Sequence, residues 1–263
     1  MTDAPCCIPR RLPDHLVEPA AARAVLIRVE NHPEVGPATG PLRRTLDGPA
    51  HPSRVAFMTT KYWGIGGVDL TVGFLDDAPA DLQARILSHA NAWGLRANVR
   101  FRLTNTDPQI RITRTPGEGY YSYLGTDCLT IPADQNTLNL DSFTMQTPDS
   151  EFFRVVRHEF GHTIGAPHEH QRAEEVARLD RRKVIQLYRT TQGWSVKEIE
   201  QQVLTPLDDS NFLFATPADE KSIMCYDVPG SVTLDGRPIV GGFDINDNDY
   251  DAAAIIYPLP RTV

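Results

Sequence analysis

The sequence is poor in cysteine and basic residues and has no long apolar run. It has 26 Lys and Arg against 34 Asp and Glu, a formal net charge of −8 at pH 7. This charge argues against nucleic acid and anionic membrane surfaces as partners. No segment approaches the length of a transmembrane helix, and the start, MTDAPCC, lacks the apolar run of a signal peptide. The chain is also disulfide-poor, since its only cysteines are Cys6, Cys7, Cys128 and Cys225.

The 263 residues are predicted to form one α+β domain preceded by an extension. Residues 1–50 are proline-rich and contain one helical candidate, 18–30. Beyond them, period-2 alternation predicts strands and helical periodicity predicts helices. Strands are expected at 68–74, 99–103, 110–112 and 136–143, the last as the edge strand. Helices are expected at 80–93, from 147 through the motif below, and at 174–190, 195–204 and 247–257. The order of strand, helix, strands, helix is α+β.

One stretch, HEFGHTIGAPH, carries most of the chemical information. His158 and His162 are four residues apart, so on a helix both imidazoles can reach a single ion. Glu159 lies beside them, where it can act as a base without binding the metal. Gly165 stands where the helix would end, because glycine adopts a left-handed conformation at little cost. The chain can then deliver His168 as a third ligand and leave a fourth position open, as in a catalytic zinc site.

These polar residues admit other interpretations. His170 competes with His168 as the third ligand, although Gly165 favours His168. The stretch could also be a surface helix that happens to carry histidines, but a strong helix start at residues 147–151 and an apolar face place it against a core. The acidic run 244–249 superficially suggests a calcium loop. It lacks the required glycine and closing glutamate, so a solvated helix start is expected there.

The motif resembles the zinc signature of the astacin family within the metzincin clan. The similarity covers roughly residues 51–258 and rests on four segments: HEFGHTIGAPHEHQR, Ser222–Tyr226, Gly119–Gly125 and Asp244–Tyr257. It implies a two-subdomain α+β zincin fold: a twisted sheet with two helices in 51–168, a mostly helical or irregular half in 169–258, and a cleft between them. Residues 259–263 would be a tail.

The resemblance also implies roles for single residues. Met224 would form the floor beneath one zinc ion, and Tyr226 would be an extra, switchable zinc ligand that also acts in catalysis. Glu169 would engage a new N-terminus after removal of a pro-segment, with cleavage near Arg43-Arg44. The family's usual disulfide positions lack cysteine here, which is consistent with a disulfide-poor, bacterial-type member.

The predicted function is a zinc endopeptidase in which Glu159 activates water to hydrolyse proteins or peptides. Two alternatives remain: a zinc-binding peptide-recognition module without broad proteolysis, and a zinc amidase acting on a cell-wall peptide. The chain is expected to be a monomer. The resemblance implies an extracellular protein, with a cytoplasmic one as the alternative. Residues 1–50 are either an inhibitory pro-segment, with Cys6, Cys7, Asp14 or Asp47 reaching the metal, or a surface tail.

Overall fold

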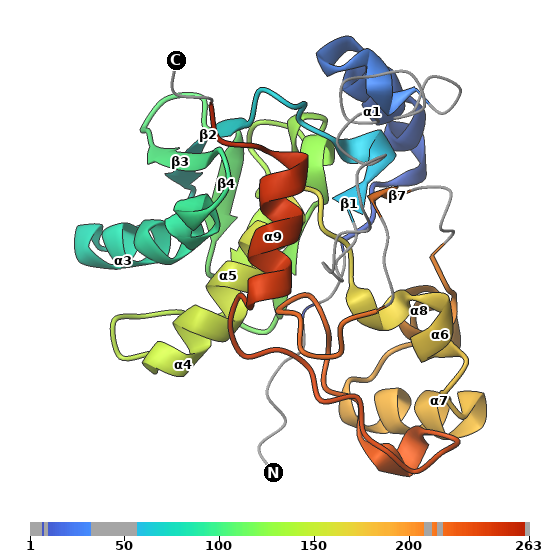
Figure 1. Cartoon of the computed structure of the whole chain (residues 1–263). Coiled ribbons are helices and arrows are strands. Elements are labelled where there is room, and N and C mark those ends of the chain that lie inside the picture. Colours follow the sequence, from blue (N-terminus) through green and yellow to red (C-terminus); the bar gives the residue numbers. More distant parts are fainter. Residues whose placement is uncertain (1–6, 8–9, 33–56, 208–211, 215–217, 261–263) are drawn as a thin grey trace.

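The computed structural model describes residues 7, 10–32, 57–207, 212–214 and 218–260, and it has the α+β architecture expected from the sequence (Figure 1). The N-terminal half of the body is built on a five-stranded sheet. Its strands are β2 (Val68–Phe74), β3 (Val99–Leu103), β4 (Ile110–Thr113), β5 (Tyr120–Ser122) and β6 (Leu138–Leu140). A second, two-stranded sheet pairs β1 (Phe57–Met58) with β7 (Phe212–Phe214).

The large sheet has the strand order β3-β2-β4-β6-β5, with parallel pairing throughout except for β5, which runs antiparallel to β6. The prediction that residues 136–143 form the edge strand is therefore wrong. Residues 138–140 of this segment form β6, which lies between β4 and β5 and is buried throughout. The edge strand on this side of the sheet is β5, within the Gly119–Gly125 segment, and β3 forms the other edge.

Two helices position the site against this sheet. Helix α3 (Ala80–Ala90) buries Leu82, Ile86 and Ala90, as its periodicity predicted. The helix that carries the first two histidines comprises α4 (Asp149–Glu151), a π-helical turn (Phe152–Val156) and α5 (Arg157–Thr163). The expected capping hydroxyl at its start, that of Thr147, instead accepts a hydrogen bond from the Thr144 N–H. Pro148 precedes the first turn without a side-chain cap.

The C-terminal half is mostly helical. It contains α6 (Ala173–Val176), α7 (Arg181–Thr191), α8 (Val196–Ile199) with a π-helical turn (Glu200–Leu204), and α9 (Asp247–Ile256). The prediction of a single helix over 174–190 is wrong, because a break separates α6 from α7 within this segment. Leu179 forms a β-bridge with Thr233, and the Asp180 side chain caps a new helix by accepting from two backbone N–H groups.

Single turns of 3-10 helix connect these elements, and two apolar clusters lie beneath them. The turns are Val29–Asn31, Thr59–Lys61, Asn91–Leu95, Gly125–Leu129, Glu169–Gln171 and Gly230–Val232. The larger cluster joins the sheet, α3, α5 and α9 and includes Met224. The smaller one lies around α7 and α8 and includes Cys225 and Tyr226. The Ser222–Tyr226 segment therefore lies where the two halves of the body meet.

The described part of the extension is ordered against the body. Helix α1 (Asp14–Ile27) overlaps the helix predicted over 18–30 but begins and ends a few residues earlier than predicted. Asn31 then bonds to both the carbonyl and the N–H of Tyr62, at 2.9 Å each. The residue 50 boundary, Cys6, Asp47 and Arg43-Arg44 lie outside the described residues. Within the described parts of the chain, no helix is long and apolar enough to cross a membrane.

Candidate metal centre and active site

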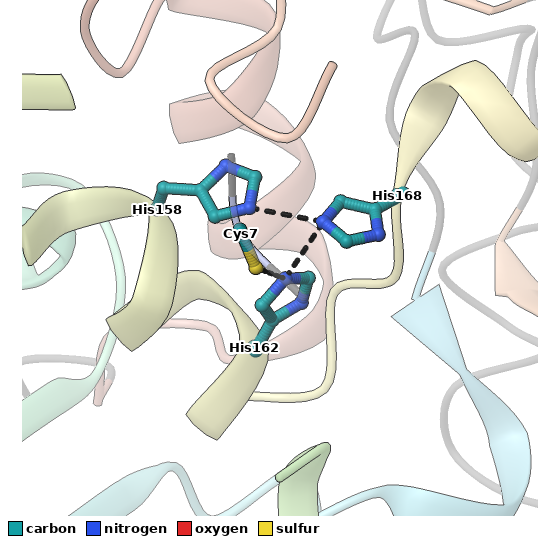
Figure 2. A group of neighbouring side chains, drawn as sticks. All are labelled: Cys7, His158, His162 and His168. Carbon is teal, nitrogen blue, oxygen red and sulfur yellow. Dashed lines mark hydrogen bonds between the residues drawn. The ribbon is translucent and has the colours of Figure 1, made fainter. Parts of the chain in front are cut away.

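Three imidazoles converge at the floor of the site. Each of His158 and His162, on α5, brings its Nε2 atom to 3.0 Å from Nε2 of His168, which follows the helix (Figure 2). All three side chains are buried. Together with Cys7, they form a group whose ligand atoms all lie within 4.8 Å of one another. The structure thus brings together the three histidines that the sequence pointed to.

Local backbone geometry explains how His168 reaches the other two. The helix ends at Thr163, and Gly165 adopts a φ of +98°, a left-handed conformation that a side chain would strain. Two backbone hydrogen bonds close the turn, from Gly165 to His162 and from Ala166 to Gly161. The chain reverses there and presents His168 to the metal-binding face of the helix.

The hydrogen bonds of the histidines fit a cation between them. Nδ1 of His158 is 2.6 Å from the Ile223 carbonyl, and Nδ1 of His162 is 2.7 Å from the Ala166 carbonyl. A carbonyl only accepts, so each Nδ1 carries the proton and each Nε2 presents a lone pair. Burial lowers the pKa of His162 to about 4 and keeps the ring in its neutral, metal-binding form. The Nε2 lone pairs of His158 and His162 therefore both point at Nε2 of His168, 3.0 Å away, an arrangement in which one cation can be bound by all three nitrogens.

Glu159 lies beside this group and is fully buried. Burial raises the pKa of its carboxyl to about 8, while the nearby Cys7 thiol and the charge of Arg154 act in the opposite direction. Glu159 is not part of the metal-ligand group. Its position and raised pKa suit a residue that exchanges a proton near neutral pH.

The segment Ser222–Tyr226, which resembles the Met-turn of the astacin family, is held by a buried carboxylate that sequence reasoning missed. Asp249 accepts hydrogen bonds from the Ser222 hydroxyl at 2.6 Å and from the Ile223 N–H at 3.0 Å. Met224, fully buried, lies against Gly161 of the metal-binding helix. The run 244–249 was expected to be a solvated helix start. It does start α9, with Asn246 and Asp249 forming a capping box, but Asp249 has no exposed surface. Nothing in the sequence separates this acid from its exposed neighbours.

Three further predicted residues surround the histidines. The Tyr226 ring lies 4.3 Å from the His168 ring, and its hydroxyl donates to the Cys7 carbonyl. His170, the competing third ligand, is outside the metal-ligand group and has Nε2 3.1 Å from the Gln202 carbonyl. Glu169 is buried, and its backbone N–H donates to the Met224 carbonyl at 3.0 Å.

Cys7 enters the site from the N-terminal extension. Its Sγ is 3.5 Å from His162 Nε2, and its backbone forms a parallel bridge with Tyr120 of the edge strand β5 (Figure 2). Of the two switch candidates that the structure describes, Cys7 lies at the metal-binding group. Asp14 is exposed in the first turn of α1 and is not in that group. Cys225 is a buried thiol whose pKa is raised by burial, and it is not in that group either.

Comparison with known proteins agrees with this geometry. The family model for astacin, a peptidase family, matches residues 61–233. A structure of myroilysin is 31% identical, covers 78% of this chain and 100% of its own, and superposes with a TM-score of 0.73. A crystal structure of myroilysin is 29% identical, covers 84% of this chain and 97% of its own, and has a TM-score of 0.58.

A more distant match supports the fold alone. High choriolytic enzyme 1, a hatching enzyme zinc-protease from the medaka fish Oryzias latipes, is 18% identical, covers 78% of this chain and 98% of its own, and has a TM-score of 0.51. A search of curated proteins found no match. From the family model and the first structure, the chain belongs to the astacin family of zinc metalloendopeptidases.

Proposed function

We propose that this zinc endopeptidase cleaves peptide bonds with Glu159 as the general base and His158, His162 and His168 as the zinc ligands. The observation that carries the proposal is the convergence of three neutral imidazoles, two of them 3.0 Å from the third, beside a buried carboxylate. Zinc in this site supplies a Lewis acid that polarises the scissile carbonyl and lowers the pKa of water.

The residues around the metal then have separate tasks. The Ile223 and Ala166 carbonyls fix the ring orientations of His158 and His162. Glu159 takes a proton from the attacking water and returns it to the departing amine. Tyr226, once its hydroxyl leaves the Cys7 carbonyl, donates to the oxygen of the peptide carbonyl as negative charge develops there. Its role as an additional zinc ligand stays a prediction from the family.

Substrate binding is expected along β5 rather than along residues 136–143. As the edge strand, β5 pairs with β6 on one side only within its sheet. Cys7 already pairs with Tyr120 there, which supports the view that an extended chain can add to this edge. Such strand addition depends on main-chain hydrogen bonds and tolerates many sequences. We therefore expect substrates to be proteins or peptides in extended conformation.

The test is cleavage of a fluorescent unfolded protein by the zinc-loaded chain carrying Cys7→Ser, with and without a chelator, beside the same chain with Glu159→Gln. Cys7→Ser is present throughout, because the Cys7 thiol lies in the metal-ligand group and would itself hold cleavage down. Asp69→Asn is the matched control, because it changes an exposed acid on β2 that pairs with Arg102 on β3. We expect the chelator and Glu159→Gln to abolish cleavage and Asp69→Asn to leave it unchanged. Zinc binding without cleavage of any protein, peptide or cell-wall peptide would favour the peptide-recognition alternative. Cleavage of cell-wall peptides alone would favour the amidase.

We also propose that the N-terminal extension keeps the enzyme latent through Cys7. A thiolate is a strong zinc ligand, and Cys7 Sγ belongs to the same group of ligand atoms as the three histidines. The backbone of Cys7 also contacts Tyr226, which is proposed to act in catalysis, and β5, which is proposed to bind the substrate. Four other predictions remain proposals. They are the division of the chain at about residue 50, the two subdomains that meet at His168, a monomeric state and secretion.

Latency is tested on the full chain with Cys7→Ser. We expect proteolysis to rise in this variant, while in a cobalt-substituted sample the thiolate-to-metal charge-transfer absorption disappears. The matched control is Cys128→Ser, which changes a buried thiol outside the metal-binding group. Equal activity and equal spectra for the wild type and Cys7→Ser would end the latency proposal.

A further inference from the structure

A cavity of about 530 Å³ opens directly beside the proposed catalytic base. Glu159 and His158 form part of its wall, together with the first turns of the metal-binding helix, α7, the segment after the Met-turn and residues 240–243. Cys7 lines it without filling it. Its size falls within the range of about 300–1,000 Å³ typical of ligand sites, so it can hold a large side chain.

Much of the lining is apolar. Val155, Leu187 and Ile223 form part of the wall, and Val240 and Phe243 join them. Val240 is 46% exposed and Phe243 is 70% exposed, so the described part of the chain leaves apolar surface uncovered at this cavity. An apolar group entering the cavity would remove that surface from water, which is favourable.

The single Lys or Arg among the described lining residues is Arg154, and it is already paired. Its Nη2 and Nε atoms bond to the two carboxylate oxygens of Glu151 at 2.7 and 3.2 Å. Its guanidinium also lies 5.9 Å from the Tyr120 ring centroid. This bidentate pair occupies the Nε–Nη2 edge of the guanidinium and neutralises its charge, which weakens its attraction for an incoming carboxylate.

One exposed acid adds negative charge at the cavity. Asp227 is exposed where it lines the cavity. Its charge disfavours an acidic group. A basic group gains little from Asp227, because exposed ion pairs contribute almost nothing, while its charge must leave water to enter an apolar cavity.

We propose that this cavity binds a large uncharged apolar side chain of the residue next to the cleaved bond, and that Glu151 excludes acidic side chains by neutralising Arg154. The inference rests on the proposed peptidase function, because it names the substrate class of the same site. Glu151 and Arg154 are specificity-determining residues here, with no part in the proton transfers.

The test uses binding, so that it does not depend on turnover. Two peptide hydroxamates that differ only in one side chain, isobutyl against carboxymethyl, are titrated calorimetrically into the zinc-loaded full chain carrying Cys7→Ser. A matched apolar group in such a pocket changes affinity by about 10- to 200-fold. We expect the isobutyl probe to bind at least about tenfold more tightly. Equal affinity, tighter binding of the acidic probe, or no binding of either probe to the zinc-loaded chain would overturn the proposal.

The role of the Glu151–Arg154 pair is tested by adding Glu151→Gln to the zinc-loaded chain that carries Cys7→Ser. The released Arg154 should bind the carboxymethyl probe, so the affinity ratio should fall by about tenfold or more while the isobutyl affinity stays unchanged. Asp69→Asn is the control, since it breaks an exposed pair on β2 and β3, away from the cavity, and should not change the ratio. Arg154→Gln should not strengthen the acidic probe. An unchanged ratio in Glu151→Gln, or a gain for the acidic probe in Arg154→Gln, would refute the role of the pair.

Measurements of binding and of cleavage distinguish a failure of the proposed pocket preference from a failure of the proposed proteolytic function. If the isobutyl probe binds preferentially but no protein or peptide is cleaved, the proposed function fails and the pocket preference stands. If proteins are cleaved, mapping of the cut sites by mass spectrometry should show apolar residues enriched at one position beside the cut. Enrichment of acidic residues there would refute the pocket preference and leave the proteolytic function intact.

Discussion

The effect of Gly161→Ala on the free energy of unfolding should change sign when Met224 is also replaced, because these two residues join the metal-binding helix to the Met-turn. Gly161 lies inside α5, and a Cβ added there would be 2.4 Å from Met224 Sδ and 3.0 Å from Trp93 Cζ2. Alanine favours a helix over glycine by about 1 kcal/mol, but overpacking a core costs about 1–3 kcal/mol. Because 2.4 Å is well inside van der Waals contact, we expect Gly161→Ala to destabilise the fold by about 1 kcal/mol.

Removing the Met224 side chain should turn that loss into a gain. Met224→Ala alone should cost about 2–5 kcal/mol, because it leaves a cavity in a fully buried position. In that background the close contact with Met224 Sδ is gone, and the vacated space lets Trp93 move away from the new methyl, which would otherwise lie 3.0 Å from its Cζ2 atom. The helix preference of about 1 kcal/mol then dominates, and it is stabilising. The predicted coupling between the two sites is therefore about 1–3 kcal/mol.

Urea unfolding of the metal-free full chain, followed by tryptophan fluorescence, measures all four free energies of unfolding of this double-mutant cycle. Gly66→Ala serves as the matched control, since a Cβ there meets nothing closer than 3.8 Å and the residue is exposed. Additive effects of Gly161→Ala and Met224→Ala would refute the reasoning, because they would mean that the helix and the Met-turn do not share this contact.

Three further outcomes are expected. Burial raises the pKa of Asp249 from 3.8 to about 7, so the folded chain keeps a proton there that the unfolded chain has released. The stability from this group should therefore fall as pH rises from 3.8 to about 7, and urea unfolding of Asp249→Asn across that window should lack this component. Gly165→Ala places a side chain at a φ of +98°, which should cost about 1–2 kcal/mol of stability. It should also weaken zinc binding, measured by chelator competition. Unchanged affinity would mean that His168 does not depend on this turn. Asn31→Ala removes two bonds to Tyr62 and should lower hydrogen-exchange protection across α1 by the equivalent of about 1–3 kcal/mol, whereas unchanged protection would mean that other contacts hold the helix.

The sequence alone determined the chemistry of the site, because that chemistry is written in short-range spacing. A four-residue separation places His158 and His162 on one helical face, and Gly165 permits the turn that brings in His168. Period-2 and helical periodicity likewise predicted the core strands and α3, since burial of one face is a local pattern. The likeness to astacins, carried by the same segments, identified the Met-turn.

Only the tertiary structure decided which distant groups meet. Strand pairing is a long-range choice, so β5 rather than residues 136–143 occupies the sheet edge. The helix expected over 174–190 breaks because Leu179 pairs with Thr233, from a distant part of the chain. Asp249 is buried beneath the Met-turn, and Cys7 reaches the histidines across 155 residues of sequence. No local pattern encodes such contacts, because they depend on how the whole core closes and not on the preferences of neighbouring residues.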